Sequence, residues 1–75
     1  MERAFLLLNV VSGTEIEINE EVKKVENVKE THFVHGMYDF IIRLESKEIK
    51  EIKNSILKIR KLSGIESTLT MNVLE

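Results

Sequence analysis

The sequence predicts a single α+β domain in which four strands form one antiparallel sheet and two helices pack on one of its faces. Four short runs are apolar or alternate apolar and polar residues, as strands do. Two segments with apolar residues every three or four positions, which is typical of helices, separate the first run from the second and the third from the fourth. Because 75 residues allow only one hydrophobic core, residues 1–75 are predicted to be one domain.

The beginning of the chain predicts a strand followed by a helix. Residues 3–11 form an apolar run rich in aromatic and β-branched side chains, which indicates a central strand. Ser12 offers an N-cap for the first helix, with Glu15 three residues later as in a capping box. Residues 14–18 also alternate polar and apolar side chains as a strand does, so the start of this helix stays open. Ile18 and Val22 then follow at helical spacing among charged residues.

The middle of the chain predicts a hairpin. Residues 28–35 are half-polar and resemble a strand, whereas residues 40–44 form a second strongly apolar strand. Gly36, Met37 and Tyr38 between them predict a tight connection.

The remaining segment predicts the second helix and the last strand. The helix is predicted to begin at Ser46, a suitable N-cap, and to end on basic residues before Gly64, which can adopt the left-handed C′ conformation. Its apolar stripe consists of Ile49, Ile52, Ile56, Leu57, Ile59 and Leu62. Residues 65–74 then alternate, with Leu69 and Met71 on one face of a strand.

The resulting order, β-α-β-β-α-β, predicts a ferredoxin-like fold with the first and third strands in the middle of the sheet. Both of these strands are apolar on both faces, whereas two helices cover only one face. At about 25 cal/mol per Å², a second apolar face leaves several kcal/mol unrealised in a monomer. The sequence therefore predicts a symmetric oligomer, the alternative being a face covered by loops or by curling of the sheet.

Composition excludes several functional classes. Cysteine is absent, which excludes disulfides and thiolate metal sites. A net charge of −2 gives no general attraction to phosphate backbones, and the basic end of the second helix has no aromatic platform beside it. No apolar run is long enough for a membrane span or a signal peptide. We therefore expect a cytoplasmic protein that binds neither nucleic acid directly nor membranes.

The sequence predicts no catalytic residue, cofactor or metal site. His32 and His35 are three residues apart on a predicted strand, so they are expected to point to opposite faces and not to hold one ion. Asp39, the only aspartate, has no histidine at a spacing that indicates a catalytic relay.

The hairpin is the more informative segment. Gly36, Tyr38 and Asp39 place a carboxylate and an aromatic ring beside a glycine that can expose its backbone N–H. Such a loop suits a small zwitterion, because the carboxylate can pair with an ammonium and the backbone can donate to a carboxylate. In the alternative interpretation, Gly36 only makes the turn, Tyr38 packs on an edge and Asp39 caps a backbone N–H.

Two short motifs stand out, Gly36-Met37-Tyr38-Asp39 in the hairpin and Ile65-Glu66-Ser67-Thr68-Leu69-Thr70 in the last strand. Together they resemble the RAM domain, the amino-acid-sensing domain of the Lrp/AsnC family of transcription regulators. The resemblance covers the whole chain. Full-length members carry an N-terminal helix-turn-helix, and none precedes the first strand here, so the chain is similar to the stand-alone RAM proteins.

This resemblance implies dimers packed through their sheets, assembly into tetramers or octamers, and an amino-acid effector bound between dimers near the hairpin. By the same resemblance Gly36, Tyr38, Asp39, Thr68 and Thr70 are the candidate effector contacts. The implied function is a non-enzymatic module linked to transcription regulation, which senses an effector or modulates a full-length Lrp/AsnC-type regulator. Two alternatives remain: a small dimeric α+β-barrel-type enzyme using one of the histidines as acid or base, and a purely structural oligomerisation module.

Overall fold

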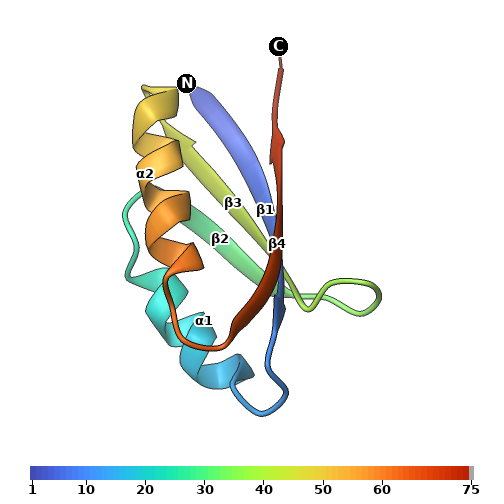
Figure 1. Ribbon diagram of the computed structural model, residues 1–75. Coiled ribbons are helices and arrows are strands. Elements are labelled where there is room, and N and C mark those ends of the chain that lie inside the picture. Colours follow the sequence, from blue (N-terminus) through green and yellow to red (C-terminus); the bar gives the residue numbers. More distant parts are fainter. Residues whose placement is uncertain (75) are drawn as a thin grey trace.

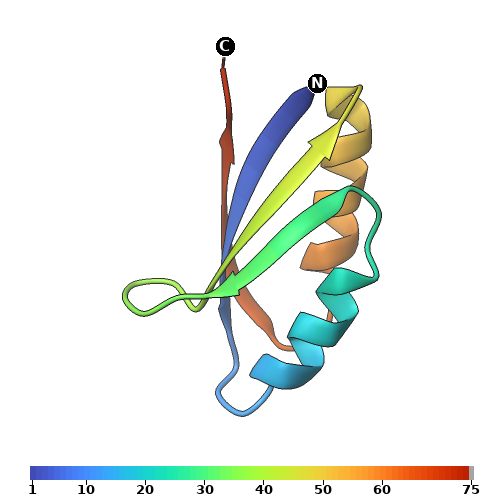
Figure 2. The same ribbon diagram turned by 180° about the vertical axis from the view of Figure 1, so that it is seen from behind.

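The computed structural model describes residues 1–74 and confirms the predicted order of elements. The elements are β1 (Glu2–Val10), α1 (Glu15–Lys23), β2 (Val28–Phe33), β3 (Phe40–Ser46), α2 (Ile49–Arg60) and β4 (Ile65–Asn72). The antiparallel sheet has the order β2-β3-β1-β4, so the first and third strands are central as predicted. Both helices lie on one side of the sheet (Figures 1 and 2). The ferredoxin-like α+β fold is therefore confirmed.

The hydrophobic core lies between the helices and the sheet face that they cover. Every second residue of β1 from Ala4 to Val10 is buried, because alternate side chains of a strand point to the same face. The core consists of Ala4, Leu6, Leu8, Val10, Ile18, Val22, Phe40, Ile42, Leu44, Ile52, Ile56 and Ile59. The apolar stripe of α2 thus packs on the two central strands, while α1 packs beside β2.

The opposite face of the sheet has no helix over it. Five apolar side chains lie on it in neighbouring register positions, because Leu7 pairs with both Ile41 and Leu69 and Phe5 pairs with Met71. Leu69 is 44% exposed and Met71 is 45% exposed. We call Phe5, Leu7, Ile41, Leu69 and Met71 the apolar band.

The first helix begins later than the sequence predicts. Its N-cap is Thr14 rather than Ser12, and the Thr14 hydroxyl makes no cap but donates to the Val11 carbonyl at 2.6 Å. The predicted partner of the cap, Glu15, does reach back toward the preceding turn, because its Oε1 accepts from the Gly13 backbone N–H at 2.7 Å. The turn is therefore closed by two side chains that leave the helix itself uncapped.

The second helix also begins later. Ser46 is not its N-cap, because Ser46 pairs with Glu2 and so extends β3 to that residue. The helix starts at Ile49 after Glu48, which has extended backbone angles and makes no side-chain cap. The prediction of Ser46 as a cap was wrong because strand pairing held the backbone of Ser46 in an extended conformation.

The hairpin connection is longer than predicted. The strand β2 ends at Phe33, so His35 lies in the connection and not on the strand, and residues 34–39 form the turn. Gly36 has φ +143°, a conformation that other L-residues rarely adopt. This loop projects beyond the sheet in Figures 1 and 2. The prediction that both histidines lie on one strand is therefore wrong.

Gly64 is required for a different reason from the predicted helix end. The C-cap of α2 is Lys61, and Gly64 lies three residues later with φ +96°. A Cβ atom there would lie 3.0 Å from Ile18 Cδ1 and 3.2 Å from Thr14 Oγ1. Gly64 therefore allows the turn into β4 to pass close to the start of α1.

One buried polar group joins the helical layer to a loop. Ser55 on α2 is 2% exposed, and its hydroxyl lies 2.7 Å from the Glu26 carbonyl oxygen. Asn27 follows with the left-handed φ of 73°, and its Nδ2 donates to Ser55 Oγ at 3.0 Å. This arrangement satisfies buried polar atoms and fixes the loop between α1 and β2 against α2.

Candidate functional site

The end of the hairpin is fixed to the central strand β1 through Asp39. The backbone N–H of Asp39 donates to the Leu8 carbonyl at 2.8 Å, and the Asp39 carbonyl accepts from Val34 N at 3.0 Å. The carboxylate is also engaged, because its Oδ2 accepts from the Val10 backbone N–H at 2.9 Å. Two backbone hydrogen bonds therefore fix Asp39 itself, and a third holds its carboxylate at the point where β1 leaves the sheet.

The position of Asp39 agrees in part with each of the two interpretations of the hairpin, the structural one and the ligand-binding one. Asp39 does cap a backbone N–H, as in the structural interpretation. Its second carboxylate oxygen, Oδ1, has no hydrogen-bond partner among residues 1–74, and so keeps its capacity to accept from a cation. Gly36 and Met37 are exposed, whereas Tyr38 is partly buried. The loop thus presents a fixed carboxylate oxygen beside an exposed backbone.

Thr68 and Thr70 lie on a different surface. They are on the side of β4 that faces the helices, and both hydroxyls are bound by one residue of α2. Arg60 Nε donates to Thr68 Oγ1 at 3.1 Å, and Arg60 Nη2 donates to Thr70 Oγ1 at 3.2 Å. Sequence reasoning treated Arg60 only as a cation at the end of a helix. Its position in the last turn, directly before the strand that bears both threonines, was the signal that could have found it.

Within one chain, the five predicted effector contacts form two groups. The strand register places Phe40, next to Asp39, on one side of Leu8 and Thr68 on its other side. The hairpin group therefore approaches β1 from β3, and the threonine group approaches it from β4. No cavity described for residues 1–74 is lined by both groups.

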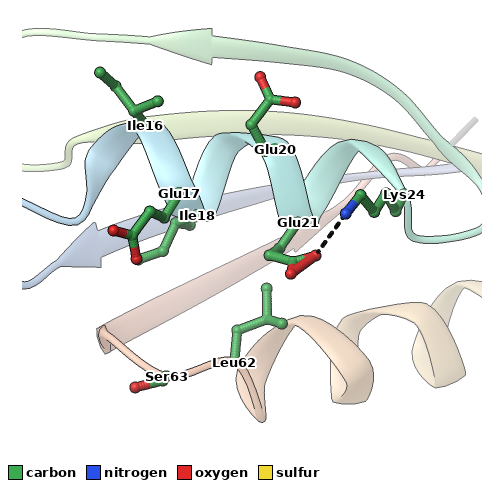
Figure 3. Close-up of a pocket in the computed structure, with 8 residues that line it drawn as sticks. All are labelled: Ile16, Glu17, Ile18, Glu20, Glu21, Lys24, Leu62 and Ser63. Carbon is green, nitrogen blue, oxygen red and sulfur yellow. Dashed lines mark ion pairs between the residues drawn. The ribbon is translucent and has the colours of Figure 1, made fainter.

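The largest of the described clefts lies between α1 and the turn after α2, and none of the predicted contacts lines it. Its volume is about 480 Å³, and its lining residues are Ile16, Glu17, Ile18, Glu20, Glu21, Lys24, Leu62 and Ser63. Figure 3 shows the ion pair of Lys24 with Glu21, whose Nζ and Oε2 atoms are 3.4 Å apart. The cleft is acidic and apolar, and no histidine stands beside the one hydroxyl in its lining, that of Ser63.

A charged cluster lies beside the apolar band on the uncovered face. Arg43 Nη2 donates to Glu30 Oε1 at 2.9 Å, and Arg43 also binds Glu45. His32 Nε2 lies 3.1 Å from Glu30 Oε2. The hydrogen bond from Arg43, followed by that from His32, lowers the pKa of Glu30. His32 thus takes part in a surface ion-pair network, and His35 lies apart from it in the exposed hairpin connection.

The described part of the chain has neither a metal-binding cluster nor a membrane-spanning helix. Among residues 1–74, no group of three or more histidine or acidic side chains is arranged to hold a metal ion. Neither of the two helices in that part of the chain has the length and apolar character needed to cross a bilayer.

Comparison with known proteins gives a consistent family match. A sequence model of the Lrp/AsnC ligand binding domain matches residues 3–75. The HTH-type transcriptional regulator FL11 from Pyrococcus abyssi is 31% identical over 72 residues, which are 96% of this chain and 48% of the regulator. The chain thus spans about half the length of the curated regulator that it matches.

Solved structures agree with this match. The crystal structure of the hypothetical protein PHS023 from Pyrococcus horikoshii has a TM-score of 0.90 and 36% identity, covering 100% of this chain and 92% of that one. The transcriptional regulator NMB0573 from Neisseria meningitidis, solved as a complex with L-Met, has a TM-score of 0.87. It is 14% identical and covers 99% of this chain and 50% of its own, so it shows likeness of fold alone.

An enzyme also contains a related segment. Homocitrate synthase from Sulfolobus acidocaldarius is 31% identical over 58 residues, which are 77% of this chain and 12% of the enzyme.

Proposed function

Because this chain belongs to the Lrp/AsnC ligand-binding domain family, we propose that it is an oligomeric, non-enzymatic domain that binds an amino-acid effector. In this proposal residues 1–75 act as one domain in the cytoplasm. The domain senses its effector or modulates a full-length Lrp/AsnC-type regulator. The related regulators contain a domain of this kind in about half of their length, so such a domain can act as the ligand-responsive half of a regulator.

The observation that carries the amino-acid proposal is the fixed carboxylate of Asp39. Its Oδ2 is held by Val10 N at 2.9 Å, while its Oδ1 accepts no hydrogen bond within residues 1–74. An oriented carboxylate with a free oxygen is the group that an ammonium needs, since charge-assisted hydrogen bonds are the stronger ones. Gly36 adds an exposed backbone to the same loop. The L-Met complex of a protein with the same fold supports this ligand class.

We further propose that the apolar band is the dimer interface and that its partner is a second copy of this chain. The band continues across β3, β1 and β4, and its charged neighbours carry both signs, so the surface is suited to pairing with itself. Burying it in a symmetric dimer would recover the free energy that a single copy leaves unrealised. The threonine and hairpin groups, which are separate in one chain, would then complete a site where dimers meet.

An effector that binds between dimers changes the assembly only through different affinities for the two oligomeric states. Calorimetry with each of the twenty amino acids, followed by native mass spectrometry, tests this directly. We expect at least one amino acid to bind and to shift the oligomer distribution, and Asp39→Ala to weaken that binding. If none binds and the assembly is indifferent to all of them, the domain is an oligomerisation module and the sensing proposal fails.

The enzymatic alternative has less support. The segment related to homocitrate synthase is 12% of that enzyme, and the longer matches are to transcription regulators. His32 is engaged by Glu30 on the uncovered face, and burial of that face in a dimer would leave the histidine no cavity in which to act. A dimer structure with an enclosed cavity between the sheets, lined by His32, would restore this alternative.

A further inference from the structure

A groove between α2 and the outer strand β4 combines cationic and apolar lining. It exists because β4 is the edge strand of the sheet and extends beyond the helix that covers β1 and β3. Its volume is about 330 Å³, and its lining residues are Lys53, Ile56, Leu57, Arg60, Thr70 and Asn72. This volume is within the lower range of small-molecule sites.

The polar lining is suited to an anion. Lys53 and Arg60 contribute two positive charges, none of the lining residues is acidic, and neither cation has an ion-pair partner among residues 1–74. Asn72 adds an amide, which can donate. The charge of the groove is therefore uncompensated within the described chain.

The orientation of Arg60 is fixed before any ligand binds. Its Nε and Nη2 donate to Thr68 Oγ1 and Thr70 Oγ1 at 3.1 and 3.2 Å, which leaves Nη1 without a partner among residues 1–74. Each threonine hydroxyl accepts from Arg60 and so keeps its own hydrogen to donate. Within the groove lining, the Arg60 Nη1 and the Thr70 hydroxyl are therefore free to donate, and a carboxylate can accept from both. Thr68, which does not line the groove, helps to fix the Arg60 guanidinium.

The apolar lining indicates what the carboxylate is attached to. Leu57 is 51% exposed although it belongs to the apolar stripe of α2, and Ile56 forms the buried part of the groove at 5% exposure. These two aliphatic side chains favour a short branched hydrocarbon over a polar or highly charged ligand.

We propose that this groove binds a small aliphatic carboxylate and that Arg60 is its principal carboxylate contact. The inference rests on the proposed function in one respect, since Thr68 and Thr70 belong to the predicted effector contacts. It also adds a constraint: the groove has no acidic residue for an ammonium, so an amino acid bound here must have its ammonium met from elsewhere, such as by Asp39 of another copy. The groove itself recognises the carboxylate and the hydrocarbon.

The test is a titration of the ¹⁵N-labelled full chain with 4-methylpentanoate, which is leucine without its amino group. We expect chemical-shift changes at Leu57, the Arg60 Nε–H and Thr70, and at least about tenfold weaker binding in Arg60→Gln. Lys58→Gln is the matched control, because it removes the same charge from the same helix turn without touching the groove lining. If Arg60→Gln does not fold, Lys53→Gln is expected to weaken binding in the same direction.

Several results would overturn the groove: no shifts with 4-methylpentanoate, shifts elsewhere, or equal weakening in Arg60→Gln and Lys58→Gln, which indicates a diffuse cationic surface. A ligand-free change of oligomeric state in Arg60→Gln would also overturn it, because Arg60 would then contact a neighbouring copy.

Failure of the proposed function gives a different set of results. If L-leucine and the other amino acids do not bind but 4-methylpentanoate does, the groove stands and amino-acid sensing fails. If an amino acid binds equally to Arg60→Gln and to the unmodified chain, amino-acid sensing stands and the groove proposal fails.

Discussion

The two faces of the sheet differ in how far their apolar side chains are buried. On the covered face, Leu6 and Leu8 are 0% exposed beneath the helices, whereas on the uncovered face Leu69 is 44% exposed and Met71 is 45% exposed. Both faces have an apolar centre, and the uncovered one also carries an ion-pair cluster centred on Arg43. The covered face therefore supplies the free energy of folding, and the uncovered face is free to supply the free energy of association.

The largest expected effect separates these roles within one strand. Leu6→Ala removes a fully buried side chain from the core and is expected to lower the free energy of unfolding by about 2–5 kcal/mol. Its neighbour Leu7 points to the uncovered face, so Leu7→Ala is expected to cost less in unfolding and to weaken association. Urea denaturation and sedimentation of both variants measure the two quantities. Equal losses of stability would show that the faces do not differ in this way.

The second prediction concerns association alone. Replacing Leu69 and Met71 together by lysine places two charges in the apolar band, and we expect the dimer dissociation constant to rise at least about 100-fold. The fold is expected to persist, because both side chains are already nearly half exposed. Sedimentation velocity reports the assembly and circular dichroism the fold. The control is Glu66→Lys, which adds a lysine at an exposed position of the same strand outside the apolar band. Thr68 is not used for this purpose, because its hydroxyl accepts from Arg60. An unchanged dimer would place the interface elsewhere.

A smaller loss is expected from the helical layer. Ser55→Ala removes the hydroxyl between the Glu26 carbonyl and the Asn27 amide, and buried groups left without a partner cost about 1–3 kcal/mol. The adjacent exposed residue gives the control, since Asn54→Ala removes a polar side chain from the same helix without breaking a described bond. Denaturation of the two variants measures the difference. Association is expected to stay unchanged in both, and a weakened dimer in Ser55→Ala would contradict the separation of the two faces.

The smallest effect is a pH dependence on the uncovered face. The pKa of Glu30 is lowered in the folded protein, chiefly by Arg43, so the ionised carboxylate stabilises the fold above its unfolded pKa. This contribution is lost as the pH falls through the folded pKa. Comparing stability at about pH 7 and about pH 3.5, we expect Glu30→Gln to lose less stability on acidification than the unmodified chain. Glu66→Gln, which removes a carboxylate from the opposite edge strand β4, is the matched control. If Glu30→Gln and the unmodified chain lose the same stability on acidification, the effect is excluded.

Much of the fold was predictable because its signals are local. The alternation in β1, the stripe of α2 and the apolar character of both central strands are properties of consecutive residues, and they determined the sheet order correctly. The errors occurred at element ends. Ser46 has the chemistry of an N-cap, but its pairing with Glu2, 44 positions away in the chain, kept it in a strand. Such competition between local preference and long-range pairing is invisible in a single segment.

The candidate site was predicted less completely. The hairpin residues stood out by composition, whereas Arg60 was grouped with the other cations of α2, although it alone is the last residue of the helix before β4. Its contact with Thr68 and Thr70 depends on the angle at which α2 crosses the sheet, which the packing of the buried stripe on β1 and β3 sets. Similarly, the hydrogen bond from Val10 to Asp39 joins two segments that meet only through strand pairing.

By itself, the sequence determined the number, type and order of the elements and the presence of two apolar sheet faces, because periodicity and residue type act over a few neighbouring residues. Tertiary structure decided which polar groups meet. It oriented the Asp39 carboxylate toward Val10 and placed Arg60 over two threonines of β4. It also left the apolar band uncovered, since two helices on one side of a four-stranded sheet bury only one of its faces.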